Sequence, residues 1–314
     1  MHGDKISNRH IIAGFATAAD LIQPVAQYLS LPYCLFLPHY HPDTETEFFR
    51  AQTIETGKVY WLIQRLWPIM SHQWILLFQL IQHLTSCANQ VFVIIPYIPH
   101  GRQSVSGRPD LDGDLLWANL LHTAGAAACL TIEAHGGTRL KLQSVSGYLG
   151  RDLYLPRHWD EPPLLVAPDQ GGWTRVQRLA RRYQCRWVGL QKVRTKAGIQ
   201  MQVDSHTIPQ VKNRCCLIID DILSTGQTIL KTAQILLDHG ALEVGASVIH
   251  ALVDDFVAKL CDFPLKFLTI TDTILPLRSN LGDLNLRVEP IFPVIARAIQ
   301  AILEKKYDNT IIRT

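Results

Sequence analysis

The chain has 314 residues, and this length predicts two domains, because a single domain usually has about 100–200 residues. Hydrophobic residues make up 47% and charged residues 18%, as in a globular protein, and a net charge of +3 does not favour nucleic acid as a partner. Seven cysteines without a CxxC pair, and an N-terminus without signal-peptide character, predict a cytoplasmic location. The most apolar segment, residues 74–84, is too short to cross a bilayer.

Short apolar segments alternate with amphipathic ones along the chain. In the first half, strands are predicted at residues 11–14, 34–37, 59–63, 91–96 and 129–132. Helices are predicted there at residues 17–29, 73–85 and 113–124. In the second half, strands are predicted at residues 164–167, 187–190, 215–219, 245–250 and 265–270. Helices follow at residues 171–183, 227–238, 254–261 and 293–304.

This alternation predicts an α/β fold in which each half has a mainly parallel sheet flanked by helices. The segment 142–163 between the halves is rich in Gly, Ser and Pro, so a domain boundary is expected near Gly147. The expected domains are residues 1–146 and 147–314, with a last helix that can pack back on the first domain.

The segment CLIIDDILSTGQTIL, residues 216–230, carries the strongest functional signal. A buried strand is predicted to end at Ile219, followed by Asp220 and Asp221 and by a loop of small hydroxylated residues before a helix. The backbone N–H groups of such a loop, together with the helix N-terminus, can bind a phosphate. The two carboxylates can accept hydrogen bonds from sugar hydroxyls or hold a divalent cation. The segment therefore predicts a site for a ribose 5-phosphate; an ordinary strand-to-helix turn with an N-cap is the alternative.

Five further polar loops follow predicted strands, where open α/β sheets bind their ligands. They are HPDTE (41–45), IPYIPHGRQ (95–103), IEAH (132–135), APDQGG (167–172) and QKVRTK (191–196). Each signal is weak alone, since His135 and Asp169 can also be structural residues and Lys192 with Arg194 can belong to a solvated loop. The arginines at 175, 178, 181 and 182 have helical spacing and predict a solvated helix face.

In this order, the loops resemble the motifs of the ribose-phosphate diphosphokinases, which make phosphoribosyl diphosphate (PRPP) from ribose 5-phosphate and ATP. HPDTE is similar to the family's FPDGE, PYIPHGRQ to PYxxYARQ, TIEAH to TxDLH, APDQGG to SPDxGG, QKVR to DKRR, and DDILSTGQT to the ribose-phosphate loop. TDTI, residues 271–274, is also a family segment. The resemblance extends over residues 11–302 and implies two phosphoribosyltransferase-like domains, the first on the ATP side.

The resemblance also implies roles for individual residues. The implied catalytic residues are Lys192 and Arg194, and the implied magnesium ligands are His135 and Asp169. The implied ATP-binding residues are His41, Asp43, Glu45, Arg102 and Gln103. The implied ribose-5-phosphate residues are Asp220, Asp221, Ser224, Thr225, Gly226, Gln227 and Thr228. Magnesium is the implied cofactor, ATP and ribose 5-phosphate are the implied ligands, and family members assemble into homo-oligomers; neither a membrane nor nucleic acid is expected.

Several positions depart from the family pattern, among them His41 for Phe, Ser104 for Asp or His, and Gln191 for Asp. These departures leave open a non-catalytic regulatory homologue, and the shared ribose loop leaves open a phosphoribosyltransferase that consumes PRPP. The residues after Arg194 have weak apolar periodicity and predict a flap that closes over bound ATP. An active synthetase is the favoured interpretation, because the lysine, arginine, histidine and acidic pair are all retained.

Overall fold

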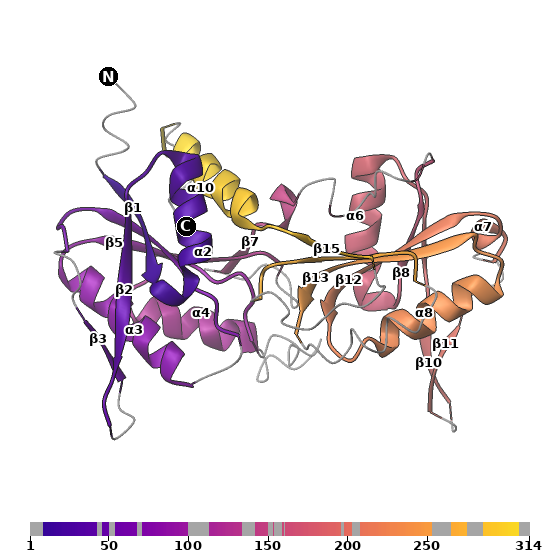
Figure 1. The fold of residues 1–314 in the computed structure, drawn as a ribbon, viewed down its shortest axis with the longest axis horizontal. Helices are drawn as coiled ribbons and strands as arrows, with labels where there is room; N and C mark the ends of the chain where they lie inside the picture. The colour runs from indigo at the N-terminus through magenta and orange to yellow at the C-terminus, as the bar shows by residue number, and fades with distance from the viewer. Residues whose placement is uncertain are drawn as a thin grey trace. The chain divides into compact units, whose positions relative to one another are not determined.

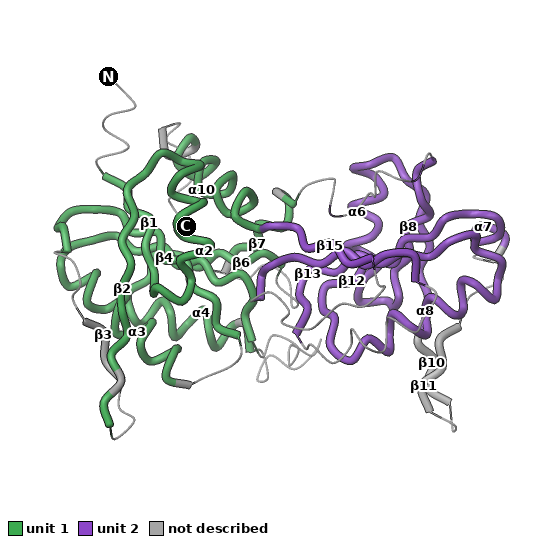
Figure 2. Tube along the Cα trace, in the orientation of Figure 1, with its two compact units in different colours: residues 1–149, 291–314 green, residues 150–290 purple. Residues whose placement is uncertain are grey.

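The computed structural model describes residues 9–42, 46–49, 54–67, 71–99, 113–133, 142–149, 153, 159, 161–195, 198–202, 208–252, 265–274 and 285–307. The chain divides into two compact units (Figure 2). Unit 1 consists of Met1–Leu149 and Ile291–Thr314, and unit 2 of Gly150–Pro290. Within the described ranges, no helix combines the length and hydropathy that a membrane span requires.

Unit 1 is built on a seven-stranded sheet with the order β3-β2-β1-β4-β5-β6-β7. All neighbours are parallel except the edge pair β2 and β3, which is antiparallel. The strands are β1 (His10–Phe15), β2 (Tyr33–Tyr40), β3 (Thr46–Phe49), β4 (Val59–Ile63), β5 (Gln90–Ile94), β6 (Ala128–Thr131) and β7 (Leu142–Ser144). Every residue of β1 and β4 is buried, which explains why these central strands contain no polar residue except His10.

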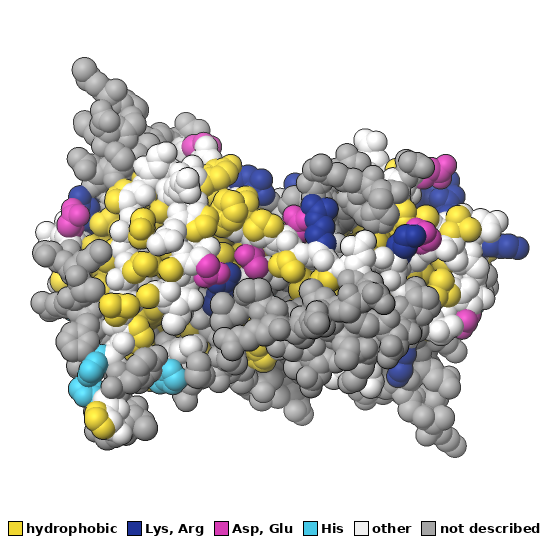
Figure 3. All heavy atoms as spheres, in the orientation of Figure 1, with side chains coloured by type: hydrophobic (Ala, Val, Ile, Leu, Met, Phe, Trp, Pro, Cys, Tyr) yellow, Lys and Arg dark blue, Asp and Glu magenta, His cyan; other side chains and the backbone are white. Residues whose placement is uncertain are grey.

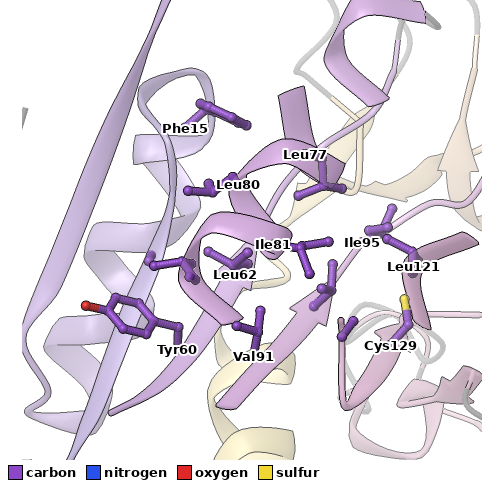
Figure 4. Close-up of a cluster of buried hydrophobic side chains, with 14 of the residues drawn as sticks. Phe15, Tyr60, Leu62, Leu77, Leu80, Ile81, Val91, Ile95, Leu121 and Cys129 are labelled. Atoms are coloured by element: carbon purple, nitrogen blue, oxygen red, sulfur yellow. The ribbon is translucent and has the colours of Figure 1, made fainter. Parts of the chain in front are cut away.

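Helices cover the sheet of unit 1 (Figure 1). They are η1 (Ala16–Ala18), α2 (Ala19–Leu29), α3 (Ser71–Ser86), α4 (Gly113–Thr123), η4 (Ser146–Tyr148) and α10 (Phe292–Tyr307). Although α10 is the last helix of the chain, it packs against α2 near the start. Leu77, Leu80 and Ile81 from α3 pack on Leu62 and Val91 of the sheet to form the core shown in Figure 4.

Unit 2 contains a six-stranded, fully parallel sheet with the order β15-β14-β13-β12-β8-β9. The strands are β8 (Leu164–Ala167), β9 (Trp187–Gly189), β12 (Cys215–Leu223), β13 (Glu243–Ala251), β14 (Leu268–Thr271) and β15 (Leu286–Glu289). A separate antiparallel hairpin consists of β10 (Gln191–Thr195) and β11 (Gly198–Gln202). The helices are η5 (Gln170–Gly172), α6 (Trp173–Tyr183), α7 (Ile208–Val211) and α8 (Gln227–Asp238).

The predicted α/β class with a mainly parallel sheet in each half is confirmed. All ten predicted strands overlap observed ones, and the strands at 59–63 and 164–167 and the helix at 227–238 have the predicted ends. Five short or edge strands, β3, β7, β10, β11 and β15, were not predicted. The helix expected at 254–261 lies outside the described residues.

Candidate active site

The acidic pair lies in β12, which is longer than predicted. The strand does not end at Ile219 but continues through Asp220 and Asp221 to Leu223. It continues because β13 pairs with it as far as Leu223, which is in register with Ala251. On its other side, the register with β8 ends at Ile218. Asp220 and Asp221 therefore follow the point at which β8 stops pairing.

This position is the topological switch point of the sheet. From β8 the chain proceeds to β9 on one side, whereas from β12 it proceeds through β13 and β14 to β15 on the other. In open α/β sheets, ligands bind outside the carboxyl ends of the two strands that flank such a point. Asp169 follows β8 here, and since Val166 is in register with Ile218, Asp169 and Asp221 each lie three residues beyond that pair.

A buried arginine neutralises the acidic pair. Arg175 Nη2 lies 2.9 Å from Asp221 Oδ2, and Arg175 Nη1 lies 4.0 Å from Asp220 Oδ1. The Arg175 side chain is only 9% exposed, so the prediction of a solvated arginine face is wrong for this residue, whereas Arg178, Arg181 and Arg182 are exposed as predicted. An arginine in the first turn of a helix is disfavoured by the helix dipole, and this is the signal that could have predicted an acidic partner.

The two carboxylates differ in their surroundings. Burial, and after it the adjacent charge of Asp221, raise the pKa of Asp220 from 3.8 to about 8, although the Arg175 guanidinium acts in the opposite direction. Asp220 Oδ1 also accepts a hydrogen bond of 2.9 Å from the backbone N–H of Asp221. Asp221, in contrast, has the closer contact with the guanidinium. One member of the pair is therefore strongly paired, and the other holds its proton more readily.

The predicted phosphate loop connects β12 to the N-terminus of α8. Gly226 is the N-cap of α8 and has φ 74°, a left-handed conformation that glycine adopts without strain. Because this N-cap has no side chain, it offers no capping oxygen to the first N–H groups of the helix, which a bound anion can accept instead. Thr225 and Gln227 are exposed, and Ser224 and Thr228 are half-buried. The structure brings all seven predicted ribose-phosphate residues together along this one segment.

Asp169 lies at the start of α6 beside a pair of glycines. It is the N-cap of η5, and its backbone carbonyl accepts a hydrogen bond of 3.1 Å from the N–H of Gly172. A Cβ on Gly171 would lie 3.2 Å from Asp169 Oδ1, and a Cβ on Gly172 would lie 3.8 Å from Arg175 Nη1. The small residues therefore leave room for both polar side chains at this end of the sheet.

Lys192 and Arg194 lie in β10, where a loop was predicted. Their backbones are in register with Met201 and Ile199 of β11, so Gln191–Thr195 and Gly198–Gln202 pair as an antiparallel hairpin. The closure of this segment over ATP stays a prediction. Residues two apart in a strand share one face, so these two positions lie on the same face of the hairpin.

The predicted ATP-binding residues belong to unit 1. His41 follows β2, and its ring packs edge-on against the ring of His39, with centroids 4.6 Å apart. Pro99, which precedes the predicted RQ segment, is held by a hydrogen bond of 3.0 Å from Trp117 Nε1 to its carbonyl. Asp43, Glu45, Arg102 and Gln103 lie outside the described residues, as does the predicted metal ligand His135.

Comparison with known proteins first defines the class. A family model, the phosphoribosyl transferase domain, matches residues 152–259, a range that contains β8, α6, β12, α8 and β13 and thus the whole switch-point site. A crystal structure of phosphoribosylpyrophosphate synthetase from Mycobacterium smegmatis has the same fold, with a TM-score of 0.77 at 20% identity, covering 95% of this chain and 99% of that one. The fold is therefore that of two phosphoribosyltransferase-like domains.

Curated relatives then identify the family. The ribose-phosphate pyrophosphokinase of Mesorhizobium japonicum is 28% identical over 295 residues, covering 89% of this chain and 92% of the relative. That of Hyphomonas neptunium is 31% identical over 229 residues, covering 70% of this chain and 72% of the relative. This chain belongs to the ribose-phosphate pyrophosphokinase family.

Proposed function

We propose that this protein is an active ribose-phosphate diphosphokinase. It transfers the β,γ-diphosphoryl group of ATP to the anomeric hydroxyl of ribose 5-phosphate and releases PRPP and AMP. The observation that carries this proposal is the segment from Asp220 to Thr228, in which an acidic pair at the switch point is followed by a helix that begins with glycine. Family membership gives the reaction, and this segment gives the acceptor sugar a place to bind.

In the reaction, the anomeric oxygen forms a bond to the β-phosphorus of ATP. The bond from that phosphorus to the oxygen bridging to the α-phosphorus breaks, AMP leaves with that oxygen, and the anomeric hydroxyl loses its proton. Such transfer needs little covalent chemistry from the protein, so catalysis rests on alignment and on neutralising charge. The 5-phosphate does not react, and its binding to the Ser224–Thr228 segment supplies orientation.

The sugar hydroxyls have suitable partners in Asp220 and Asp221. A carboxylate accepts hydrogen bonds from hydroxyl groups, and Arg175 keeps Asp221 in one orientation. Because Asp220 holds its proton more readily than an ordinary aspartate, it can also donate one hydrogen bond to a hydroxyl oxygen. The pair can therefore distinguish a vicinal diol from a sugar that lacks one hydroxyl.

Lys192 and Arg194 are proposed to stabilise the charge that develops on the migrating diphosphoryl group. Both residues occupy one face of the β10–β11 hairpin, which is the proposed flap over the nucleotide. Arg102 and Gln103 are proposed to contact ATP, and His41, Asp43 and Glu45 to hold its adenine.

Magnesium is the proposed cofactor, with Asp169 and His135 as its protein ligands. Within the described residues, no group of three or more His, Cys, Asp or Glu side chains could hold a metal ion. Magnesium usually takes one or two protein ligands and completes its octahedron with water and substrate phosphate oxygens, so one carboxylate and one imidazole would suffice. When bound, magnesium would neutralise the phosphate charges of ATP.

The direct test is AMP formation from ATP and ribose 5-phosphate by the purified protein, without a nucleobase. AMP that depends on both substrates and on magnesium supports the proposal. Phosphoribosyl transfer to a base without AMP formation would instead indicate a phosphoribosyltransferase. Binding of ribose 5-phosphate without turnover, with every nucleoside triphosphate as donor, would indicate a regulatory homologue.

We also propose a cytoplasmic homo-oligomer. Large hydrophobic side chains are exposed on unit 1, among them Tyr28, Tyr33 and Leu37, each about half exposed. Hydrophobic side chains also gather on the face of unit 1 that Figure 3 shows. Exposed apolar patches of this kind often mark protein interfaces. Sedimentation velocity of the purified protein tests the assembly, and a monomer at micromolar concentration would contradict it.

A further inference from the structure

A buried polar cluster lies at the carboxyl ends of β13 and β14, and the proposed chemistry does not use it. His250, Thr271 and Thr273 are exposed by 1%, 3% and 1%. The hydroxyl of Thr271 donates a hydrogen bond of 2.6 Å to the carbonyl oxygen of Ile249, and that of Thr273 lies 3.3 Å from the same oxygen. His250 Nδ1 lies 3.0 Å from the Thr273 hydroxyl. We call His250, Thr271 and Thr273 the β13 clamp.

The clamp continues the connection between two strands beyond their backbone pairing. In the described sheet, β13 and β14 are in register at Ala246–Leu268 and Ser247–Thr269. Two residues further along β13, the Ile249 carbonyl receives the two threonine hydroxyls instead. A buried carbonyl requires a partner, so these hydroxyls fix the end of β14 against β13.

The clamped part of β13 is the part that supports the sugar-phosphate segment. His250 is in register with Ile222, and Ala251 with Leu223. The backbone N–H of Leu252 also donates a hydrogen bond of 2.8 Å to the carbonyl of Leu223, the last residue before the loop that starts at Ser224. The end of β12 therefore takes its position from β13 on this side, while on the other side the register with β8 has already ended.

We propose that His250, Thr271 and Thr273 are positioning residues for ribose 5-phosphate. They hold the ends of β12 and β13 in place, so that the acidic pair and the phosphate loop are arranged before the sugar binds. This inference rests on the proposed function. The clamp lies in unit 2, and its described contacts reach the sugar segment. Loss of the clamp therefore weakens the binding of ribose 5-phosphate and leaves the affinity for ATP unchanged. Preorganised hydrogen-bond donors lose affinity when their supports loosen.

The test compares Thr273→Val with Thr273→Ser. Valine has the shape of threonine without its hydroxyl, and serine keeps the hydroxyl. We expect Thr273→Val to raise both the KM and the calorimetric Kd for ribose 5-phosphate by about fivefold to tenfold, the loss of one buried hydrogen bond. The KM for ATP should change less than about twofold, and Thr273→Ser should restore most of the affinity. His250→Leu, which keeps both threonine bonds to Ile249, should also raise the KM and Kd for ribose 5-phosphate. It replaces Thr273→Val in the test if that variant folds poorly.

Ser247→Ala is the matched control. Ser247 lies in the same strand, is 1% exposed, and donates a hydrogen bond of 2.6 Å to the carbonyl of Leu153, before the clamped end. It should lower the melting temperature without changing the Kd for ribose 5-phosphate.

An unchanged Kd in both Thr273→Val and His250→Leu would overturn the clamp. A wild-type protein that binds ribose 5-phosphate without releasing AMP would overturn the proposed function, and the Kd comparison would still decide the clamp. A wild-type protein that does not bind ribose 5-phosphate would overturn both.

Discussion

Arg175 Nη2 lies 2.9 Å from Asp221 Oδ2, and both side chains are only 9% exposed. This pair joins the first turn of α6 to β12 at the place where β8 no longer pairs with β12. An ion pair this deep is costly to break from one side, because the remaining charge stays buried without its partner. It therefore fixes the geometry of the acidic pair more than it stabilises the fold.

Replacing Asp221 tests this relationship. We expect Asp221→Asn to lower the free energy of unfolding by about 1–3 kcal/mol, because the Arg175 guanidinium loses its closest charged partner. The KM for ribose 5-phosphate should rise at least tenfold, since a carboxylate acceptor is lost as well. Urea denaturation and steady-state kinetics measure the two effects. Full stability in Asp221→Asn would show that the ion pair contributes little in solution.

Replacing Asp220 should have the opposite effect on stability. Its pKa is raised in the folded protein, so the unfolded chain loses this proton first, and stability falls as the pH rises from about 4 to about 8. Asparagine carries no charge and can still accept the hydrogen bond from the N–H of Asp221. We expect Asp220→Asn to be the more stable protein at pH 8, by at least about 1 kcal/mol, since one pKa unit corresponds to about 1.4 kcal/mol.

The measurement is the free energy of unfolding at a series of pH values. The difference in the free energy of unfolding between Asp220→Asn and wild type should be small at pH 4 and should grow to pH 8. The Asp220→Asn variant should form less AMP than wild type. A difference that does not change with pH would show that Asp220 titrates as an ordinary aspartate. Together, the two variants separate the member of the pair that is paired with Arg175 from the member that burial disfavours.

The charged face of the β10–β11 hairpin gives a prediction about catalysis. We expect Lys192→Ala to lower kcat about 100-fold to 1000-fold, the effect of losing one preorganised contact to transition-state charge, with little change in either KM. Lys212→Ala is the control, because Lys212 is an exposed residue of unit 2 that has no proposed role. Near-normal turnover of Lys192→Ala would refute the assigned role.

The sequence predicts the centre of each sheet better than its edges, and burial explains why. All residues of β4 and β8 are buried, so their apolar runs begin and end with the strands. The edge strand β15 is half exposed and polar, with Arg287 among its residues, and gives no such pattern. Likewise, β12 was predicted to end at Ile219 because two aspartates interrupt the apolar run, although pairing with β13 extends it to Leu223.

The candidate site shows the same division between local and long-range information. The acidic pair and the phosphate loop are contiguous in the chain, so a motif locates them. Arg175 is separated from Asp221 by 46 positions, and only the order of β8 beside β12 brings the two together. The spacing of Arg175 with Arg178 and Arg182 is that of a solvated helix face. This spacing alone does not distinguish Arg175, whose side chain is buried, from the exposed arginines. Of the clamp residues, His250 was predicted only as the end of an apolar strand, and Thr271 and Thr273 only as members of the family segment TDTI.

Unit 1 contains an ion pair at its own switch point, with the charges exchanged. Its chain proceeds from β1 to β2 on one side and from β4 to β5 on the other. Arg65, the second residue after β4, places its Nη1 2.7 Å from a carboxylate oxygen of Asp20 in the first turn of α2. In unit 2 the strand carries the acid and the helix the arginine. Among the described residues at the switch point of unit 1, no acidic pair is therefore offered to sugar hydroxyls.

This exchange predicts a difference between two equivalent mutations. We expect Asp20→Asn to lower the free energy of unfolding by about 1–2 kcal/mol, because the Arg65 side chain is 3% exposed and loses a charged partner. Unlike Asp221→Asn, it should leave the KM for ribose 5-phosphate unchanged, since the proposed sugar site is the acidic pair of unit 2. Calorimetric titration of wild type should accordingly give one ribose 5-phosphate per chain. A second equivalent of sugar, lost in an Arg65→Met variant, would show instead that the arginine of unit 1 binds the phosphate group and that both switch points are functional.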